Sequence, residues 1–194
     1  MPTDDELADA LISARAGDEQ GFAVLWRALH PAVLRYLRVV AGGAAEDVAS
    51  ETWLQVARDL DRFTGDPAAF RGWLFSIARN RGIDELRRAG RRREDPSGSV
   101  APESIGRDAA AEVIEGAETA WALERIAALP ADQAEAVMLR VVAGLDVAAT
   151  AHVLGKRRGA VRIATMRGLR RLAADPDVRK RAPDSSRQET AGEV

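Results

Sequence analysis

Apolar residues recur at helical spacing in two blocks of the chain, and each block predicts a set of helices. In the first block, one apolar stripe repeats every three or four residues from Phe22 to Leu37, which is the pattern of an amphipathic helix. Asp18 is the expected cap of this helix, and the glycine pair at 42–43 is its expected end. We expect Pro31 to kink or divide the helix.

Three further helices are predicted around this stripe. Thr3 and Glu6 have the spacing of a capping box and predict a short first helix. A third helix is expected over 45–60. A loop over 61–66 then precedes a fourth helix, with a proline in its first turn and a strongly basic C-terminal end.

The second block predicts four more helical segments. One covers 121–129, and the next runs from Pro130 to Gly144. Four of its residues are expected to face inward: Val137, Met138, Val141 and Val142. Asp146 can cap a short helix, and Gly155 separates that helix from a cationic one.

A change in composition marks the boundary between the blocks. Residues 94–118 contain Pro, Gly and Ser, with seven acidic groups and one arginine, which is typical of a linker. The chain after Ala174 is polar and has no periodicity. We therefore predict an all-α protein with two small helical domains, over 1–93 and 119–174. A flexible acidic linker over 94–118 joins them, and a disordered tail over 175–194 follows.

The composition excludes several kinds of site. The chain has no cysteine and two histidines that are far apart, so we expect no disulfide and no metal site. It shows no nucleophile–base set, cofactor fingerprint or phosphate-binding glycine-rich loop, so we expect no cofactor and no enzymatic activity. The N-terminus begins with polar, acidic residues, and no apolar run approaches the ~20 residues of a membrane span. These features predict a cytoplasmic protein.

The most informative motif is the cationic segment over 155–172. It has seven basic side chains and no acidic one, although the whole chain has a net charge of −2. A short helix and a glycine turn precede it, as in a helix-turn-helix. Arg158 and Arg162 lie four residues apart on one helical face, where arginine can bind guanine. Phosphate contacts are expected from the other basic residues: Lys156, Arg157, Arg167, Arg170 and Arg171. The inward positions are expected to be Val161, Leu169 and Leu172. The alternative is a basic amphipathic helix that binds RNA, a membrane or an acidic protein.

The third helix presents two faces. The core face should contain Ala49, Trp53, Val56, Ala57 and Leu60. On the other face, polar residues surround Leu54: Asp47, Glu51, Gln55 and Arg58. This second face is either a solvated polar surface with one exposed leucine, or a docking surface on which Leu54 is the apolar anchor.

The loop and fourth helix, over 63–93, combine aromatic side chains with arginines. Three apolar residues should be core: Phe70, Leu74 and Ile77. Trp73, Asn80 and the arginines leave two interpretations open. They form either a solvated face or a surface that holds single-stranded DNA, with aromatic rings stacking bases and cations neutralising phosphates.

Three segments, in this order, resemble motifs of the bacterial sigma factors of the extracytoplasmic-function (ECF) branch. Residues 45–53 read AEDVASETW, similar to the family's AEDxxQETF, with Ser50 where the family usually has Gln. Residues 70–88 read FRGWLFSIARNRGIDELRR, similar to its FxxWLxxIAxNxxxDxxRR. Residues 129–172 resemble its region four, with Arg157 in place of the usual Ser cap. The resemblance covers about 18–93 and 118–173.

The resemblance implies a role for each surface. The third-helix face would bind the clamp helices of the RNA polymerase β′ subunit through Asp47, Glu51, Leu54, Gln55 and Arg58. The loop and fourth helix would melt and read the minus-ten promoter element through Arg62, Phe63, Trp73, Arg79, Asn80 and Asp84. The helix-turn-helix would read the minus-thirty-five element through Lys156, Arg157, Arg158, Arg162 and Arg167.

The family also implies the partners and the kind of activity. Region four would dock the β flap of the polymerase, and an anti-sigma factor would control the protein. No membrane contact of its own is expected. The predicted function is that of a non-enzymatic transcription initiation factor. The alternative is a helix-turn-helix regulator that binds duplex DNA without polymerase and recognises a palindrome as a dimer.

Overall fold

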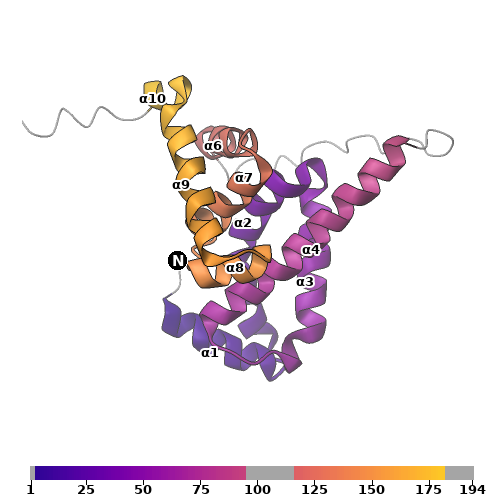
Figure 1. The fold of residues 1–194 in the computed structure, drawn as a ribbon. Helices are drawn as coiled ribbons and strands as arrows, with labels where there is room; N and C mark the ends of the chain where they lie inside the picture. The colour runs from indigo at the N-terminus through magenta and orange to yellow at the C-terminus, as the bar shows by residue number, and fades with distance from the viewer. Residues whose placement is uncertain (1–2, 95–115, 182–194) are drawn as a thin grey trace, which may run out of the picture.

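The structure is a computed structural model, and it describes residues 3–94 and 116–181 (Figure 1). All of the regular secondary structure in these two ranges is helical. The first range contains α1 (Asp4–Arg15), α2 (Glu19–Ala41), α3 (Ala45–Asp59) and α4 (Pro67–Glu94). The second contains α6 (Ala117–Ala127), α7 (Ala131–Val137), α8 (Val147–Leu154), α9 (Arg158–Ala174) and α10 (Pro176–Arg181). None of the helices in these ranges is long and apolar enough to span a membrane.

Helix starts in the first range are fixed by side chains that bind free backbone amides. The Thr3 hydroxyl accepts from the Glu6 amide at 3.2 Å, and the Glu6 carboxylate accepts from the Thr3 amide at 2.7 Å, which confirms the capping box. The Asp18 carboxylate accepts from two amides at the start of α2. Helix α2 ends at Gly42, which has a φ of +59°. Of the two effects expected at Pro31, division of the helix is wrong, because α2 continues through it, and a kink stays a prediction.

The four N-terminal helices form one bundle around buried aromatic residues. Tyr36 of α2 and Phe75 of α4 meet edge to face, with ring centroids 5.6 Å apart, and both are fully buried. Helices α1 and α2 approach closely at Gly21, where a Cβ atom would lie 2.7 Å from the Ala14 amide nitrogen. In the N-terminal bundle, defined here as α1 to α4, four residues of the predicted apolar stripe are buried, whereas Trp26 is 41% exposed: the buried ones are Leu25, Leu29, Val33 and Leu37.

The C-terminal domain, defined here as α6 to α10, contains the predicted helix-turn-helix. Asp146 caps α8 by accepting from the Ala149 amide at 2.6 Å. Gly155 ends α8 in the left-handed conformation, with a φ of +62°, and α9 begins three residues later. Helices α7 and α9 pack together at Gly168.

A π-helical turn, Met138–Val142, follows α7 and changes which side chains face inward. The Ala143 amide donates to the Met138 carbonyl five residues back, so the turn is one residue wider than an α-helical turn. Met138 is fully buried, but Val141 is 59% exposed. The prediction that Val141 faces inward is therefore wrong, because ordinary helical spacing does not hold across this turn.

Two other inward predictions are wrong, and so is part of the predicted tail. Ala57 is exposed, and so is Leu169, at 43%. Residues 176–181, predicted as disordered, form α10, which Asp175 caps through the Asp177 amide at 2.9 Å. The Arg181 guanidinium lies 4.8 Å from the centre of the Trp121 ring, so α10 also contacts α6. The remaining tail and linker residues, 182–194 and 95–115, lie outside the described ranges.

The two domains pack directly on each other. Helix α8 lies against α4, and α6, α7 and the π-turn lie against α2 (Figure 1). The buried apolar residues of both domains form one continuous core. The C-terminal end of α4 projects away from this packed body (Figure 1).

Candidate nucleic-acid interface

The cationic face of α9 is open to solvent. All five residues predicted to contact duplex DNA are exposed: Lys156, Arg157, Arg158, Arg162 and Arg167. The opposite face is anchored by Val161 and Ala164, which are 0% and 6% exposed. Among the described residues, the four arginines have no ion-pair partner, and the Lys156 ammonium lies 3.9 Å from the Asp132 carboxylate.

The N-terminal end of α9 has free backbone amides and a partial positive charge, which favour phosphate binding. Arg157 occupies the cap position, and its side chain makes no capping hydrogen bond, so the first amides of the helix keep their free donors. A helix N-terminus carries a partial positive charge that attracts anions. The arginines and the helix start therefore present positive charge on the same side, as contact with a DNA backbone requires.

A second candidate surface surrounds the loop before α4. The rings of Phe63 and Trp73 stack with centroids 5.1 Å apart, and Phe63 meets Phe70 edge to face. Phe70 is buried, whereas Phe63 and Trp73 are partly exposed. Asp66 caps α4 by accepting from the Ala69 amide at 2.7 Å. The structure thus brings the two predicted strand-reading aromatics together over the buried Phe70 ring.

The polar members of this predicted surface lie in different environments. Arg62, Asn80 and Asp84 are exposed. Arg79 instead donates from Nε to the Glu135 carboxylate of α7 at 2.6 Å, and its side chain is only 21% exposed. Its DNA contact stays a prediction, because in this arrangement the guanidinium binds a carboxylate of the other domain.

Tyr36 completes the surroundings of Glu135. Its hydroxyl donates to the same carboxylate oxygen at 3.3 Å. Burial raises the pKa of the Tyr36 hydroxyl far above its ordinary value, and the negative charge of Glu135 raises it further, while Arg79 opposes the shift. The phenol therefore stays protonated and remains a hydrogen-bond donor at physiological pH.

The predicted docking face of α3 is exposed around one apolar side chain. Leu54 is 63% exposed, and three charged neighbours are exposed with it: Asp47, Glu51 and Arg58. Gln55 is partly buried. The exposure of Leu54 fits both interpretations of this face, so its docking role stays a prediction.

Sequence reasoning missed the residue that orders this face. Arg81 of α4 donates to the Glu51 carboxylate at 2.8 Å and to the Gln55 side-chain carbonyl at 3.0 and 3.1 Å. In the sequence it is one of the basic residues at the end of the fourth helix, for which a solvated face and phosphate contacts are both left open. The pairing links residues 26 and 30 positions apart in the sequence, and only the packing of α3 on α4 reveals it.

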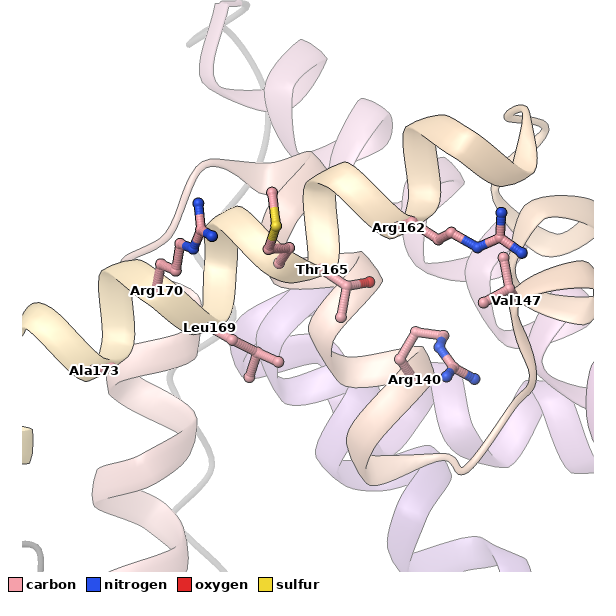
Figure 2. A pocket seen from close by; sticks show the side chains of 8 residues that line it. Arg140, Val147, Arg162, Thr165, Leu169, Arg170 and Ala173 are labelled. Atoms are coloured by element: carbon pink, nitrogen blue, oxygen red, sulfur yellow. The ribbon is translucent and has the colours of Figure 1, made fainter.

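An apolar groove beside α9 was also not predicted. It has a volume of about 530 Å³, and Figure 2 shows the side chains that line it. They come from α9, α8 and the π-turn: Arg140, Val147, Arg162, Thr165, Met166, Leu169, Arg170 and Ala173. Arg140 donates to the Leu145 carbonyl, which fixes one wall. Met166 and Leu169 are exposed because they line this groove, at 41% and 43%. Helical spacing in the sequence did not indicate it.

Comparison with known proteins identifies each half of the chain. Residues 25–92 match the family Sigma-70 region 2, and residues 119–172 match Sigma-70, region 4. The ECF RNA polymerase sigma factor BldN of Streptomyces coelicolor is 35% identical over 163 residues, which are 82% of this chain and 62% of that protein. The ECF RNA polymerase sigma factor SigD of Mycobacterium tuberculosis H37Rv is 35% identical over 181 residues, which are 89% of this chain and 85% of that protein.

The fold is also that of a solved sigma factor. The co-crystal structure of the sigma factor RpoE with the anti-sigma factor NepR from Bartonella quintana superposes with a TM-score of 0.61 at 21% identity. The match covers 84% of this chain and 98% of that one. It includes both helical domains, as the sequence predicted.

Proposed function

The chain belongs to the ECF RNA polymerase sigma factors, and from this premise we propose that it directs core RNA polymerase to a particular set of promoters. It acts by binding and catalyses no reaction itself. The observation that carries the proposal is the pair of separate surfaces on two domains. One is an exposed cationic recognition helix, α9, and the other is an aromatic and polar surface at the start of α4.

Duplex recognition is assigned to α9. Arg158 and Arg162 lie one turn apart on its exposed face, within reach of neighbouring base edges once the helix enters a major groove. Lys156, Arg157 and Arg167 bind phosphates and set the register of the helix on the DNA. The minus-thirty-five element is thus read as duplex.

Single-strand recognition is assigned to the loop before α4 and to α4 itself. Phe63 and Trp73 offer ring faces to unstacked bases, and Asn80 and Asp84 offer exposed hydrogen-bonding groups further along α4. Arg62 and Arg79 supply cations for the backbone. Captured bases offset the lost stacking of the melted minus-ten element, so melting requires no nucleotide hydrolysis.

Polymerase binding is assigned to α3. Leu54 is the apolar anchor, and Asp47, Glu51, Gln55 and Arg58 surround it. The C-terminal domain contacts the β flap as well. Control by an anti-sigma factor is supported by the similar fold of RpoE, which was solved with the anti-sigma factor NepR. The protein acts where polymerase and promoter DNA are, inside the cell.

Selection from a random duplex library, with and without core polymerase, tests this function. A sigma factor should enrich sequences only when polymerase is present, and the sequences should share two motifs at a fixed spacing. Enrichment of a palindrome by the chain alone would show a conventional helix-turn-helix regulator instead.

A further inference from the structure

Glu135 of the C-terminal domain is inserted between two residues of the N-terminal bundle. Arg79 donates to its Oε2 atom at 2.6 Å, and Tyr36 donates to the same atom at 3.3 Å. The side chains of Arg79 and Glu135 are 21% and 17% exposed, and Tyr36 is fully buried. An ion pair this shielded is weakly screened by water, and the loss of one partner would leave an uncompensated charge.

The same side of α4 carries a second contact with the C-terminal domain. A Cβ atom at Gly72 would lie 3.8 Å from the Ala149 side chain of α8. The Ser76 hydroxyl donates to the Gly72 carbonyl at 2.9 Å, so its hydrogen bond is made within α4. Gly72, Ser76 and Arg79 are spaced by four and three residues, and therefore share one face of α4. This face is covered by α7 and α8.

The covered face lies next to the proposed strand-reading residues. Arg79 is bound within the interface, while Asn80, the next residue, is exposed. A nucleic-acid phosphate and the Glu135 carboxylate are both anions that bind a guanidinium through charge-assisted hydrogen bonds. The two cannot occupy Arg79 Nε together.

We propose that Glu135 is an intramolecular latch that holds the C-terminal domain on the N-terminal bundle in the free protein and withholds Arg79 from nucleic acid. Opening the latch separates α8 from α4 and releases the guanidinium for a phosphate. Because only open molecules bind, the apparent dissociation constant of the free protein for nucleic acid equals that of the open form divided by the fraction of molecules that are open. The consequence for promoter binding rests on the proposed function, whereas the latch itself does not.

A distance measurement on the full chain, without polymerase or DNA, tests the latch. Because the chain has no cysteine, spin labels can be placed on single engineered cysteines at Asp9 of α1 and at Ala128 after α6, both exposed. The wild type should give a narrow distribution around one distance. Glu135→Lys places a cation against Arg79 and should shift the distribution to longer distances.

The matched control is Glu124→Lys. Glu124 is exposed on α6 and has no ion-pair partner among the described residues, so the charge change is the same while the latch is intact. Its distribution should equal that of the wild type. A second opening variant, Ala149→Leu, adds bulk at the α8–α4 contact and leaves every charge in place. Far-UV circular dichroism should show wild-type helix content in all three variants.

Binding of a random-sequence single-stranded DNA oligonucleotide gives an independent readout. Glu135→Lys should bind it on the order of tenfold more tightly than Glu124→Lys, within the range typical of coupled sites. Unchanged distances in both folded opening variants would overturn the latch. The distances of the wild type would then be measured again with core polymerase added. Longer distances in both opening variants, together with a wild-type distribution that core polymerase leaves unchanged, would support the latch and contradict the proposed function.

Discussion

The Arg81 guanidinium lies 2.8 Å from the Glu51 carboxylate and joins α4 to the exposed face of α3. The same guanidinium binds Gln55, so one arginine fixes two of the five residues assigned to polymerase binding. The pair is partly exposed, and such pairs contribute only about 0.2–1 kcal/mol to stability. Its importance lies in the orientation of the face.

Replacing Arg81 should therefore weaken polymerase binding more than folding. We expect Arg81→Met to lower the affinity for core polymerase several-fold, while the thermal midpoint falls by only a few degrees. Arg71→Met is the control, because Arg71 of α4 pairs at 3.0 Å with Asp4 of α1 and not with α3. Equal losses of affinity in both variants would contradict a specific role for Arg81.

The Leu54 side chain should be the anchor of the polymerase contact. Leu54→Asp should lower the affinity for core polymerase by about tenfold or more, the size of a typical hot-spot loss. It should leave stability nearly unchanged, because the side chain is 63% exposed. Ile12→Asp on α1 is matched in exposure, at 66%, and should bind polymerase like the wild type. Equilibrium binding to labelled core polymerase measures both, and a normal affinity for Leu54→Asp would remove α3 from the interface.

The arginines of α9 should divide into two groups. Arg158→Ala and Arg162→Ala should each relax specificity at one base pair of the minus-thirty-five element, at a cost of about 1–3 kcal/mol. Arg167→Ala should instead weaken binding to all sequences. The slope of the logarithm of the binding constant against the logarithm of the salt concentration should become smaller by about one, because one phosphate contact is lost. Competition binding of the polymerase complex to single-base promoter variants separates these effects. Identical specificity profiles for the three variants would contradict the assignment.

Two glycines of α9 should respond oppositely to alanine. At Gly168, a Cβ atom would lie 2.8 Å from Val137 Cγ2, and overpacking of this kind costs about 1–3 kcal/mol. At Gly159, nothing lies within 4 Å of the added carbon, so alanine should stabilise the helix by about 0.4–1 kcal/mol. Urea unfolding followed by circular dichroism measures both, and a stabilised Gly168→Ala would show that α7 and α9 are less tightly packed than described.

His30 should make stability depend on pH below neutrality. It stacks on Trp26 with ring centroids 4.5 Å apart, and burial lowers its pKa below the ordinary value of 6.5, with Glu46 opposing the shift. The unfolded chain therefore binds more protons, and stability falls as pH drops from about 6.5 through the lower folded pKa. His30→Phe removes this effect. The wild type should lose free energy of unfolding relative to the variant between about pH 7.5 and about pH 5.5, and a constant difference would contradict the shift.

Local features of the fold could be predicted from the sequence because their causes are local. The capping box at Thr3, the left-handed Gly155 and the buried Val161 follow from neighbouring residues and helical spacing. Val141 could not be placed, because a π-turn changes the spacing that the prediction assumes. Helix α10 was missed because its polar sequence has no apolar stripe, and contacts with α6 hold it in place.

The sequence predicted which residues belong to each candidate site, but it did not predict which side chains contact one another there. The exposure of Leu54 and of the α9 arginines follows from helix periodicity. The partners of Arg79 and Arg81 depend on how helices pack across the fold, and Glu135 is 56 residues from Arg79. No local pattern distinguishes an arginine that will bind phosphate from one that will bind a distant carboxylate.

Transcription itself tests the central claim most directly. Core polymerase would be incubated with a fragmented GC-rich bacterial genomic DNA library, with and without the full chain, and transcript 5′ ends would be sequenced. A sigma factor should create new start sites, each preceded by two shared motifs at a fixed spacing, and Leu54→Asp should abolish them while Ile12→Asp retains them. The same start sites with and without the chain would contradict the assignment.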